Sequence, residues 1–383
     1  MKVVVIHNLT AGGAHRRLTE QVAALDADVV EVTTTHAEPV TARPYLVPLH
    51  LRAPRLPSVA RPPARYLDLR RLVAAWAEIG ALTRRIGADV VYANPDSVLR
   101  GAMPCGPLPF PVLRYCDEPR RIDYEPALRA TRRAGTRGLY AVLHRQQRRL
   151  DRAALADSSA VATNSRYTAG QIRRAYGRTA DVVPCGVPSF MAPGPSAAAH
   201  HLLSVGAMIA SKGHDLVIQA AALCRLQLPV IVVAHRGDAI EEQRLHTLAR
   251  GSGVPLQIKI GVSDQELVVL YQNAFATLYL AAAEPLGLVS LEAQACGSPV
   301  VVATEGGLPE TLRDGVTGFA VARDPEAAAQ ALNYLADGVR RNRIVQAAAR
   351  HGASVSWADC TKTLHRALTS LAETAAEQRT VLK

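Results

Sequence analysis

Residues 281–301, AAAEPLGLVSLEAQACGSPVV, place a short turn between a strand and a helix, and this stretch decides how the chain is organised. The apolar run before it, FATLYLA, has the length of a buried strand, whereas LVSLEAQACG has helical spacing and ends at Gly297. Glu284 and Glu292 bracket the turn, which also contains Gly287. Strand, tight turn and helix form the unit from which parallel sheets are built. The stretch therefore predicts an α/β domain with polar groups at the carboxyl end of a strand.

The same alternation runs along the whole chain. Helical patterns are expected at 69–86, 212–226, 241–250 and 265–273. The strand-like runs are KVVVIHN, DADVVEVTT, ADVVYANP, FPVLRYC and SAVATNS in the first half, and HLLSVGA, PVIVVAH, LQIKIG, FATLYLA and SPVVVAT in the second. Between the halves, VPCGVPSFMAPGPSAAAHH is rich in Pro, Gly and Ala, which is typical of a domain boundary. We expect two doubly wound, Rossmann-like parallel-sheet domains, with ligands bound where the strands end.

Composition narrows the class of protein. A chain of 383 residues is too long for one ordinary core, and 20% charged residues suit a globular protein. The six cysteines are scattered with no Cys-x-x-Cys pair, which disfavours zinc and disulfides. The apolar run before His7 has only four residues, too few for a signal peptide, and the longest apolar stretch, 267–283, is too short to span a bilayer. We therefore expect a cytoplasmic protein.

Positive charge is concentrated in the first half of the chain. Residues 1–188 carry a net charge of +12 and residues 189–383 carry −1, consistent with the total of +11. The densest run, Arg120 to Arg152, holds ten arginines. We interpret it as a solvated basic face, with contact to an anionic membrane, at the inner membrane face, or to a phosphate-bearing substrate as the alternatives. No nucleic-acid-binding motif is visible, so we expect no nucleic-acid partner.

The turn in residues 281–301 suits a nucleotide-diphospho-sugar. The amides of Leu288 and Val289 would lie at a helix N-terminus, which attracts phosphate. Gly287 has no Cβ, so a ligand can approach the backbone closely. Glu292 would suit the vicinal hydroxyls of a ribose, and Glu284 those of a second sugar. The alternative is that both glutamates are simply solvated.

This stretch resembles the Glu-x7-Glu segment of the family-four retaining glycosyltransferases of GT-B fold. Further segments resemble the same family in the family's order, and together they cover nearly the whole chain: HNLTAGGAHR, TNSRYTAGQIRRAYG with VVPCGV, LLSVGAMIASKGHDLVIQA, TEGGLPETLRDGVTGFAV and VSWADCTKTL. The resemblance implies an acceptor-binding domain over residues 1–188 and a donor-binding domain over 189–355. Residues 356–383 would form a helix that crosses back to the first domain.

The resemblance also assigns roles to individual residues. Lys212 would hold the donor diphosphate, and Gly12 and Gly13 would approach the same phosphates. The donor site would be completed by Leu286, Gly287, Leu288, Val289, Glu284 and Glu292. Catalytic roles would fall to Glu284, Lys212 and Asp117.

Two positions depart from the family pattern. Ala207 stands where many members have an arginine that clamps the diphosphate, a contact worth about 1.5–3 kcal/mol; nearby Arg236 is a candidate replacement. Asp117, in RYCDEPRR, stands where relatives commonly have a histidine facing the reacting sugar. An aspartate accepts a hydrogen bond from a hydroxyl but cannot donate one as histidine does. The identity of the sugar or acceptor is therefore open.

The expected function is transfer of a hexose-type sugar from a nucleotide-diphospho-sugar to a hydroxyl of an unidentified acceptor, with retention. The alternatives are a GT-B sugar-nucleotide epimerase or phosphorylase, and a non-catalytic sugar-nucleotide-binding or membrane-associated protein. Asp26 and Asp28 form an Asp-x-Asp pair far from any motif, so we interpret them as surface residues and expect no metal cofactor. His7 ends the first strand and either lines the cleft or is structural. The Pro- and Arg-rich stretch 37–66 is expected to be a long loop that serves binding or is disordered. Its arginines would favour an anionic acceptor such as a lipid phosphate; the alternative is that the loop covers a small molecule similar to an antibiotic.

Overall fold

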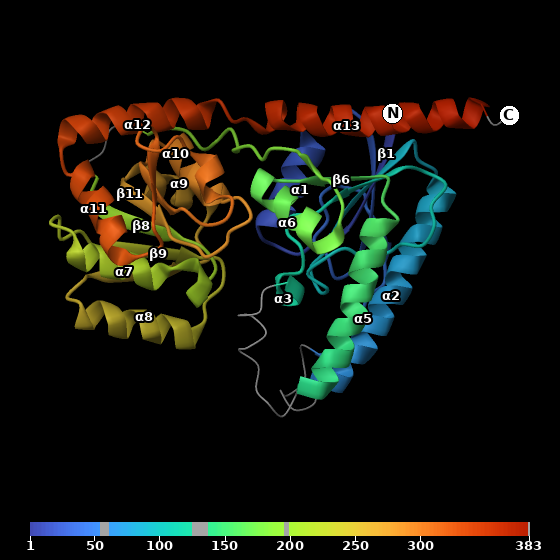
Figure 1. The fold of residues 1–383 in the computed structure, drawn as a ribbon, viewed down its shortest axis with the longest axis horizontal. Helices are drawn as coiled ribbons and strands as arrows, with labels where there is room; N and C mark the ends of the chain where they lie inside the picture. The colour runs from blue at the N-terminus through green and yellow to red at the C-terminus, as the bar shows by residue number, and fades with distance from the viewer. Residues whose placement is uncertain (54–60, 125–136, 195–198, 382–383) are drawn as a thin grey trace. The chain divides into compact units, whose positions relative to one another are not determined.

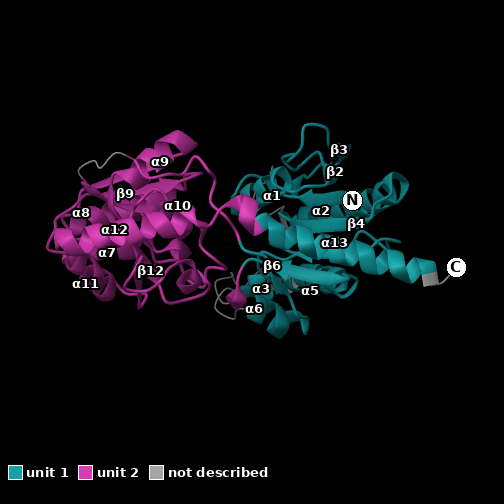
Figure 2. Ribbon diagram, turned by 90° about the horizontal axis from the view of Figure 1, so that it is seen from above, with its two compact units in different colours: residues 1–164, 168–184, 361–383 teal, residues 165–167, 185–360 magenta. Residues whose placement is uncertain are grey.

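The computed structural model describes residues 1–53, 61–124, 137–194 and 199–381, which divide into two compact units (Figures 1 and 2). Unit 1 comprises Met1–Asn164, Thr168–Pro184 and Thr361–Lys383. Unit 2 comprises Ser165–Tyr167 and Cys185–Cys360. Each unit has its own parallel sheet and its own buried apolar core, so each is described separately.

Unit 1 contains a seven-stranded sheet in the order β3-β2-β1-β4-β5-β6-β7, with every pairing parallel. Its strands are β1 (Lys2–Asn8), β2 (Asp28–Thr34), β3 (Tyr45–Val47), β4 (Val90–Asp96), β5 (Val112–Tyr115), β6 (Ala160–Thr163) and β7 (Asp181–Val182). The five strands predicted for this half are confirmed, because their valine-rich runs are buried on both faces as a doubly covered parallel sheet requires.

Helices cover both faces of this sheet. They are α1 (Gly13–Ala23), α2 (Arg61–Ile86), α3 (Arg121–Tyr124), α5 (Arg137–Ala156), α6 (Arg166–Tyr176) and α13 (Trp357–Val381). Val4 and Ile6 of β1 pack in a cluster that includes Leu72 of α2. Val3 of β1 packs on the other face in a cluster that includes Leu364 of α13. Side chains along β1 thus alternate between the two faces of the sheet and contribute to the apolar core on each side.

The prediction of a long loop over residues 37–66 holds for only part of this stretch. This stretch contains β3, which pairs with β2 at the edge of the sheet, and the beginning of α2. The strand is only three residues long, too short for its alternation to be recognised. The prolines at the start of α2 lie in the first turn, where backbone N–H groups have no intrahelical acceptor. Residues 54–60 lie outside the described part of the chain.

Unit 2 contains a six-stranded parallel sheet in the order β10-β9-β8-β11-β12-β13. Its strands are β8 (His201–Val205), β9 (Val230–Ala234), β10 (Leu256–Ile260), β11 (Ala274–Tyr279), β12 (Val300–Ala303) and β13 (Gly318–Val321). Its helices are η3 (Ala210–Lys212), α7 (His214–Leu223), α8 (Ala239–Gly251), α9 (Asp264–Gln272), α10 (Leu288–Ala295), η4 (Leu308–Thr311), α11 (Pro325–Leu335) and α12 (Gly338–Ala353).

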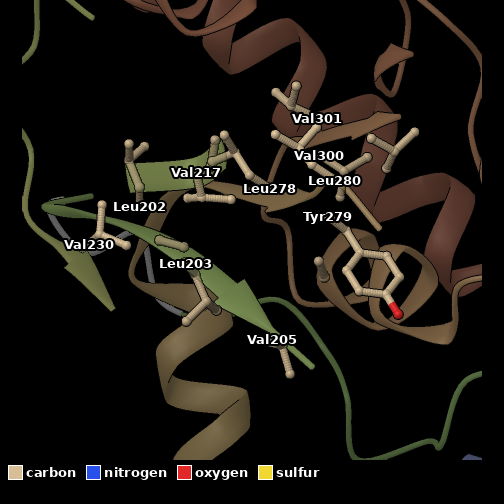
Figure 3. Close-up of a cluster of buried hydrophobic side chains, with 14 of the residues drawn as sticks. Leu202, Leu203, Val205, Val217, Val230, Leu278, Tyr279, Leu280, Val300 and Val301 are labelled. Atoms are coloured by element: carbon tan, nitrogen blue, oxygen red, sulfur yellow. The ribbon is translucent and has the colours of Figure 1, made fainter. Parts of the chain in front are cut away.

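The strand order reverses between β8 and β11, and this position locates the candidate site. Loops leaving such adjacent strands diverge to opposite faces and open a crevice at the carboxyl edge of the sheet. Figure 3 shows the aliphatic side chains of β8, β11 and β12 beneath this edge, with the hydroxyl of Tyr279 pointing away from them. The turn that contains Glu284 and Gly287, and α10 after it, follow β11. In the parts of the chain that the structure describes, no helix combines the length and apolarity needed to cross a membrane.

Candidate functional site

Two loops of unit 2 build the site, one after β8 and one after β11. Gly213 adopts φ 74°, and a Cβ on it would lie 2.3 Å from the carbonyl oxygen of Leu280. The Ala282 amide donates to the Ser211 carbonyl at 2.8 Å. Only glycine allows this backbone conformation and this close approach together. Lys212 is therefore held directly beside the end of β11.

A buried histidine fixes the first loop from beneath. His214, at the start of α7, is 1% exposed. Its Nε2 lies 3.1 Å from the carbonyl oxygen of Ala207, and its Nδ1 lies 2.8 Å from the hydroxyl of Ser204. Nε2 must donate to the carbonyl, so Nδ1 accepts from the hydroxyl. Burial lowers the pKa of His214, which keeps the ring neutral and the loop geometry constant near neutral pH.

Lys212, Glu284 and Tyr279 form a compact polar cluster at the carboxyl edge. Nζ of Lys212 lies 2.7 Å from Oε2 of Glu284 and 3.0 Å from the Tyr279 hydroxyl. The Lys212 and Glu284 side chains are 20% and 17% exposed, whereas Tyr279 is buried. Burial, together with the nearby charge of Glu284, raises the pKa of Tyr279 well above its usual value. The phenol therefore stays protonated and serves as a neutral hydrogen-bonding group.

The turn after β11 leads directly into α10. Gly287 precedes the helix with φ 106°, and a Cβ there would lie 2.4 Å from Cδ2 of Leu308. Leu288 and Val289 follow as the first residues of α10, and their N–H groups precede any intrahelical acceptor. The structure thus places these amides at the positive end of a helix dipole, in the turn that begins at Glu284. Leu286 lies within the same turn.

A Gly-Gly loop after β12 supports this turn. The Gly307 amide donates to the carbonyl of Glu284 at 2.7 Å. A Cβ on Gly306 would lie 2.3 Å from that same carbonyl oxygen, and one on Gly307 would lie 2.2 Å from the carbonyl oxygen of Pro285. The two glycines therefore pack against the backbone of the turn at distances that any side chain would prevent.

Glu292 lies one turn after Leu288 on α10, and residues at this spacing share a face of a helix. The structure buries Glu292, and its Oε2 accepts a hydrogen bond from the Tyr271 hydroxyl at 3.1 Å. It is not paired with Lys212. The two glutamates of the opening stretch thus have different surroundings: Glu284 faces a cation, and Glu292 faces a phenol.

The remaining predicted residues lie in unit 1. Gly12, with φ 141°, precedes α1, and Gly13 is the first residue of that helix. Asp117 follows β5, where Arg17 of α1 binds it with two parallel hydrogen bonds, Nε to Oδ1 at 2.8 Å and Nη2 to Oδ2 at 2.9 Å. Asp117 is 21% exposed at its side chain, and Arg17 only 1%. The carboxylate that stands where relatives commonly have a histidine is therefore paired with the guanidinium of Arg17.

Arg17 was not singled out from the sequence, yet all five of its N–H donors are used. Besides Asp117, the guanidinium donates to Gln21, the Tyr92 hydroxyl and Asn94, at 2.7–3.1 Å. Burial lowers the pKa of Arg17, but the charge of Asp117, the two tyrosines Tyr92 and Tyr115 and the hydrogen bond to Asp117 together raise it above its usual value. Arg17 therefore remains a buried cation.

Other candidates have structural surroundings. His7 is fully buried, with Nε2 2.8 Å from Oε1 of Glu31, and its Nδ1 accepts from the Leu9 amide. It faces the interior of unit 1. Asp26 and Asp28 are exposed, as interpreted from the sequence. Within the described residues, no group of three or more His, Cys, Asp or Glu side chains is placed to hold a metal ion.

Comparison with known proteins agrees with this geometry. Residues 197–351 match the model of the family "Glycosyl transferases group 1". The matched residues all lie in unit 2, which is therefore similar to this family. The match contains η3, the turn before α10 and the Gly-Gly loop, which are the segments that build the site in unit 2.

Curated relatives include two proteins named D-inositol 3-phosphate glycosyltransferase. The one from Geodermatophilus obscurus is 36% identical over 59% of this chain and 56% of its own length. The one from Acidothermus cellulolyticus is 34% identical over 53% of this chain and 51% of its own length. This chain thus aligns with about half the length of the curated relatives it matches.

Solved structures of the same fold extend over both units. Sucrose-phosphate synthase from Thermosynechococcus elongatus superposes with a TM-score of 0.74 at 20% identity, covering 97% of this chain and 99% of its own. The Anabaena protein HepE in complex with UDP-glucose gives 0.72 at 17% identity, covering 97% and 100%. The predicted fold class, GT-B with two Rossmann-like doubly wound domains, is thereby confirmed.

Proposed function

We propose that this protein is a retaining glycosyltransferase that moves a hexose from a nucleotide-diphospho-sugar to a hydroxyl acceptor. The observation that supports this most directly is the cluster in unit 2, where Lys212 and Glu284 lie beside the N-terminus of α10. A cation and free helix amides favour a diphosphate, and a carboxylate favours the hydroxyls of a sugar.

Each donor-site residue has a distinct role in this proposal. Lys212 and the amides of Leu288 and Val289 bind the diphosphate. Glu292 binds the ribose hydroxyls, with Tyr271 holding its carboxylate in position, and Glu284 binds the transferred sugar together with the turn backbone at Leu286 and Gly287. Contact between the phosphates and Gly12 or Gly13 stays a prediction from the resemblance.

The chemistry follows from where charge develops. The bond between the sugar C1 and the diphosphate oxygen breaks, a bond from C1 to the acceptor oxygen forms, and negative charge grows on the departing diphosphate. A preorganised ammonium and backbone amides stabilise that charge without rearranging. With retention, the acceptor enters on the face from which the diphosphate leaves, so a phosphate oxygen can take the acceptor proton.

The acceptor is the less defined substrate. Asp117, paired with Arg17, would accept a hydrogen bond from an acceptor or sugar hydroxyl. The positive charge of residues 1–188 favours an anionic acceptor. Because two relatives carry the name D-inositol 3-phosphate glycosyltransferase, D-inositol 3-phosphate is the first acceptor to test.

A panel of nucleotides tests the donor assignment. Melting temperatures are measured with UDP, GDP, dTDP and ADP and their glucose conjugates, with and without EDTA, because a ligand that binds only the folded state raises the midpoint. Lys212→Ala should weaken binding of the preferred nucleotide about tenfold or more, the loss of one charge-assisted phosphate contact. Lys259→Ala is the matched control, since Lys259 pairs with Glu266 on β10 and α9. A wild-type protein that binds none of these nucleotides would contradict the proposal.

The basic first half supports one additional role, peripheral contact with an anionic membrane at its inner face. On α5, Arg145, Arg148, Arg149 and Arg152 are all exposed, and Val142 is 53% exposed among them. Cosedimentation with phosphatidylglycerol vesicles should fall as salt rises and disappear in phosphatidylcholine vesicles. Equal binding to both lipids would exclude this role.

A further inference from the structure

In unit 2, the cation proposed for the diphosphate is paired with a carboxylate. Lys212 Nζ is within 2.7 Å of Glu284, and the Tyr279 hydroxyl is within 3.0 Å of the same nitrogen. Both charged side chains are largely shielded from water, so their attraction is stronger than that of an exposed pair. A diphosphate that approaches Lys212 must therefore compete with Glu284.

The outcome of this competition depends on whether the diphosphate carries a sugar. A free nucleoside diphosphate takes Lys212 from Glu284 and leaves a shielded carboxylate without its cation, which is unfavourable. A nucleotide sugar brings hydroxyl donors to the same carboxylate, and these replace the lost ammonium. Loss of the Lys212–Glu284 pair thus weakens the binding of the free nucleoside diphosphate, whereas the sugar hydroxyls compensate for it in the nucleotide sugar.

We propose that the Lys212–Glu284 pair makes this site select the intact sugar donor over the free nucleoside diphosphate that transfer leaves behind. The proposal rests on the donor assignment above and adds a property to it. An enzyme whose product differs from its donor only by the sugar gains faster product release from such a contact. Glu284 acts here as a competitor for Lys212 in the unliganded and product states and as a sugar ligand in the donor state.

Tyr279 is the positioning residue of this exchange. Its ring is fixed in the core beneath the carboxyl edge, so its hydroxyl stays in place when ligands change (Figure 3). In the structure this hydroxyl accepts a hydrogen bond from Lys212, and the phenol also interacts with Glu284. When Lys212 turns to a phosphate, the hydroxyl proton remains available to Glu284. Tyr279 thus holds the carboxylate in the position where it meets the sugar.

Titration calorimetry with UDP and with UDP-glucose tests the proposal in the full chain. Glu284→Gln keeps the shape of the side chain and removes the competing charge. UDP should bind about two- to fivefold more tightly, the range expected for release of a partly exposed ion pair, whereas UDP-glucose should bind more weakly than it does to wild type. Both changes should therefore reduce the preference for UDP-glucose over UDP.

Two variants separate this effect from simple loss of negative charge. Glu305→Gln removes an exposed carboxylate next to the Gly-Gly loop and should leave both affinities within twofold of wild type. Tyr279→Phe keeps the Lys212–Glu284 pair, so UDP affinity should hold while UDP-glucose affinity falls. Tighter UDP binding in Tyr279→Phe would show that Tyr279 competes with UDP for Lys212, and it would contradict the role proposed for Glu284.

The two proposals fail in different ways. If UDP binds wild type and Glu284→Gln binds it equally or more weakly, the selection mechanism is wrong and the donor site stands. If wild type binds no nucleoside diphosphate, the donor site itself is wrong. Should GDP bind and UDP not, the same comparison is made with GDP and GDP-glucose, and the same results decide it.

Discussion

Replacing Asp117 by asparagine tests whether the buried cation Arg17 depends on this carboxylate. The substitution keeps the size of the side chain but removes its charge. It also turns an amide NH₂ toward a guanidinium that has only donors, since each Asp117 oxygen accepts one Arg17 hydrogen bond. Arg17 would then be left 1% exposed, with the neutral groups of Gln21, Tyr92 and Asn94 as its hydrogen-bond partners.

The expected cost follows from the burial of both partners. Breaking a fully buried ion pair from one side costs about 3–5 kcal/mol. Because Asp117 is 21% exposed, water compensates part of the loss, and we expect unit 1 to lose about 2–4 kcal/mol of stability. Arg17→Met is then added to Asp117→Asn. The double variant should be about 1–2 kcal/mol more stable to unfolding than the sum of the two single effects predicts.

The protein provides its own fluorescent reporter for this assay. It has two tryptophans: Trp76 is buried in unit 1, where its Nε1 donates to Asp96, and Trp357 belongs to unit 2. In a Trp357→Phe background, urea unfolding followed by fluorescence therefore reports unit 1. Asp26→Asn, at an exposed position, is the control for charge alone. Equal unfolding midpoints for the two variants would refute this account of Asp117.

Three further predictions address other parts of the structure. Burial lowers the pKa of His7 below 6.5, so His7 takes up a proton more readily in the unfolded chain than in the folded one. Unit 1 should therefore lose stability as the pH falls below 6.5. His7→Gln should reduce this pH dependence in the same fluorescence assay. Gly306 and Gly315 have similar φ angles of 72° and 71°, but of the two only Gly306 packs against backbone, that of Glu284. Gly315→Ala should lower the free energy of unfolding measured by calorimetry by about 1–2 kcal/mol, the cost of the backbone conformation alone. Gly306→Ala should lower it clearly more. Tyr271→Phe should weaken UDP binding by about threefold in calorimetry through its hydrogen bond to Glu292, and unchanged affinity would remove Glu292 from the ribose assignment.

The sequence predicts those parts of the fold that have a repeating pattern of sufficient length. Valine-rich runs of five to seven residues, such as those of β1 and β9, favour buried strands by their length and β-branched content, and they are confirmed. The strands β3 and β7 have three and two residues, and periodicity cannot be read over so few positions. They exist because a neighbouring strand offers them an edge, which is a tertiary property.

The candidate site divides in the same way. Glu284, Gly287 and Glu292 lie in one strand–turn–helix segment, so their proximity follows from local geometry. The contact between Arg17 and Asp117 joins residues 100 positions apart. The Lys212–Tyr279 contact joins residues 67 positions apart. No spacing rule predicts such pairs, because they arise from the order of strands in the sheets.

The contribution of α13 to the core of unit 1 has a consequence for biosynthesis. Leu364 and Leu368 are fully buried in the cluster that holds Val3, Val5 and Leu18, although the whole of unit 2 separates them in the chain. During translation, the residues of unit 2 are complete before this part of α13 emerges from the ribosome. The apolar face of unit 1 that α13 covers therefore stays partly exposed until unit 2 has been synthesised. A chaperone that binds nascent apolar surface would find its target in the first half of the chain.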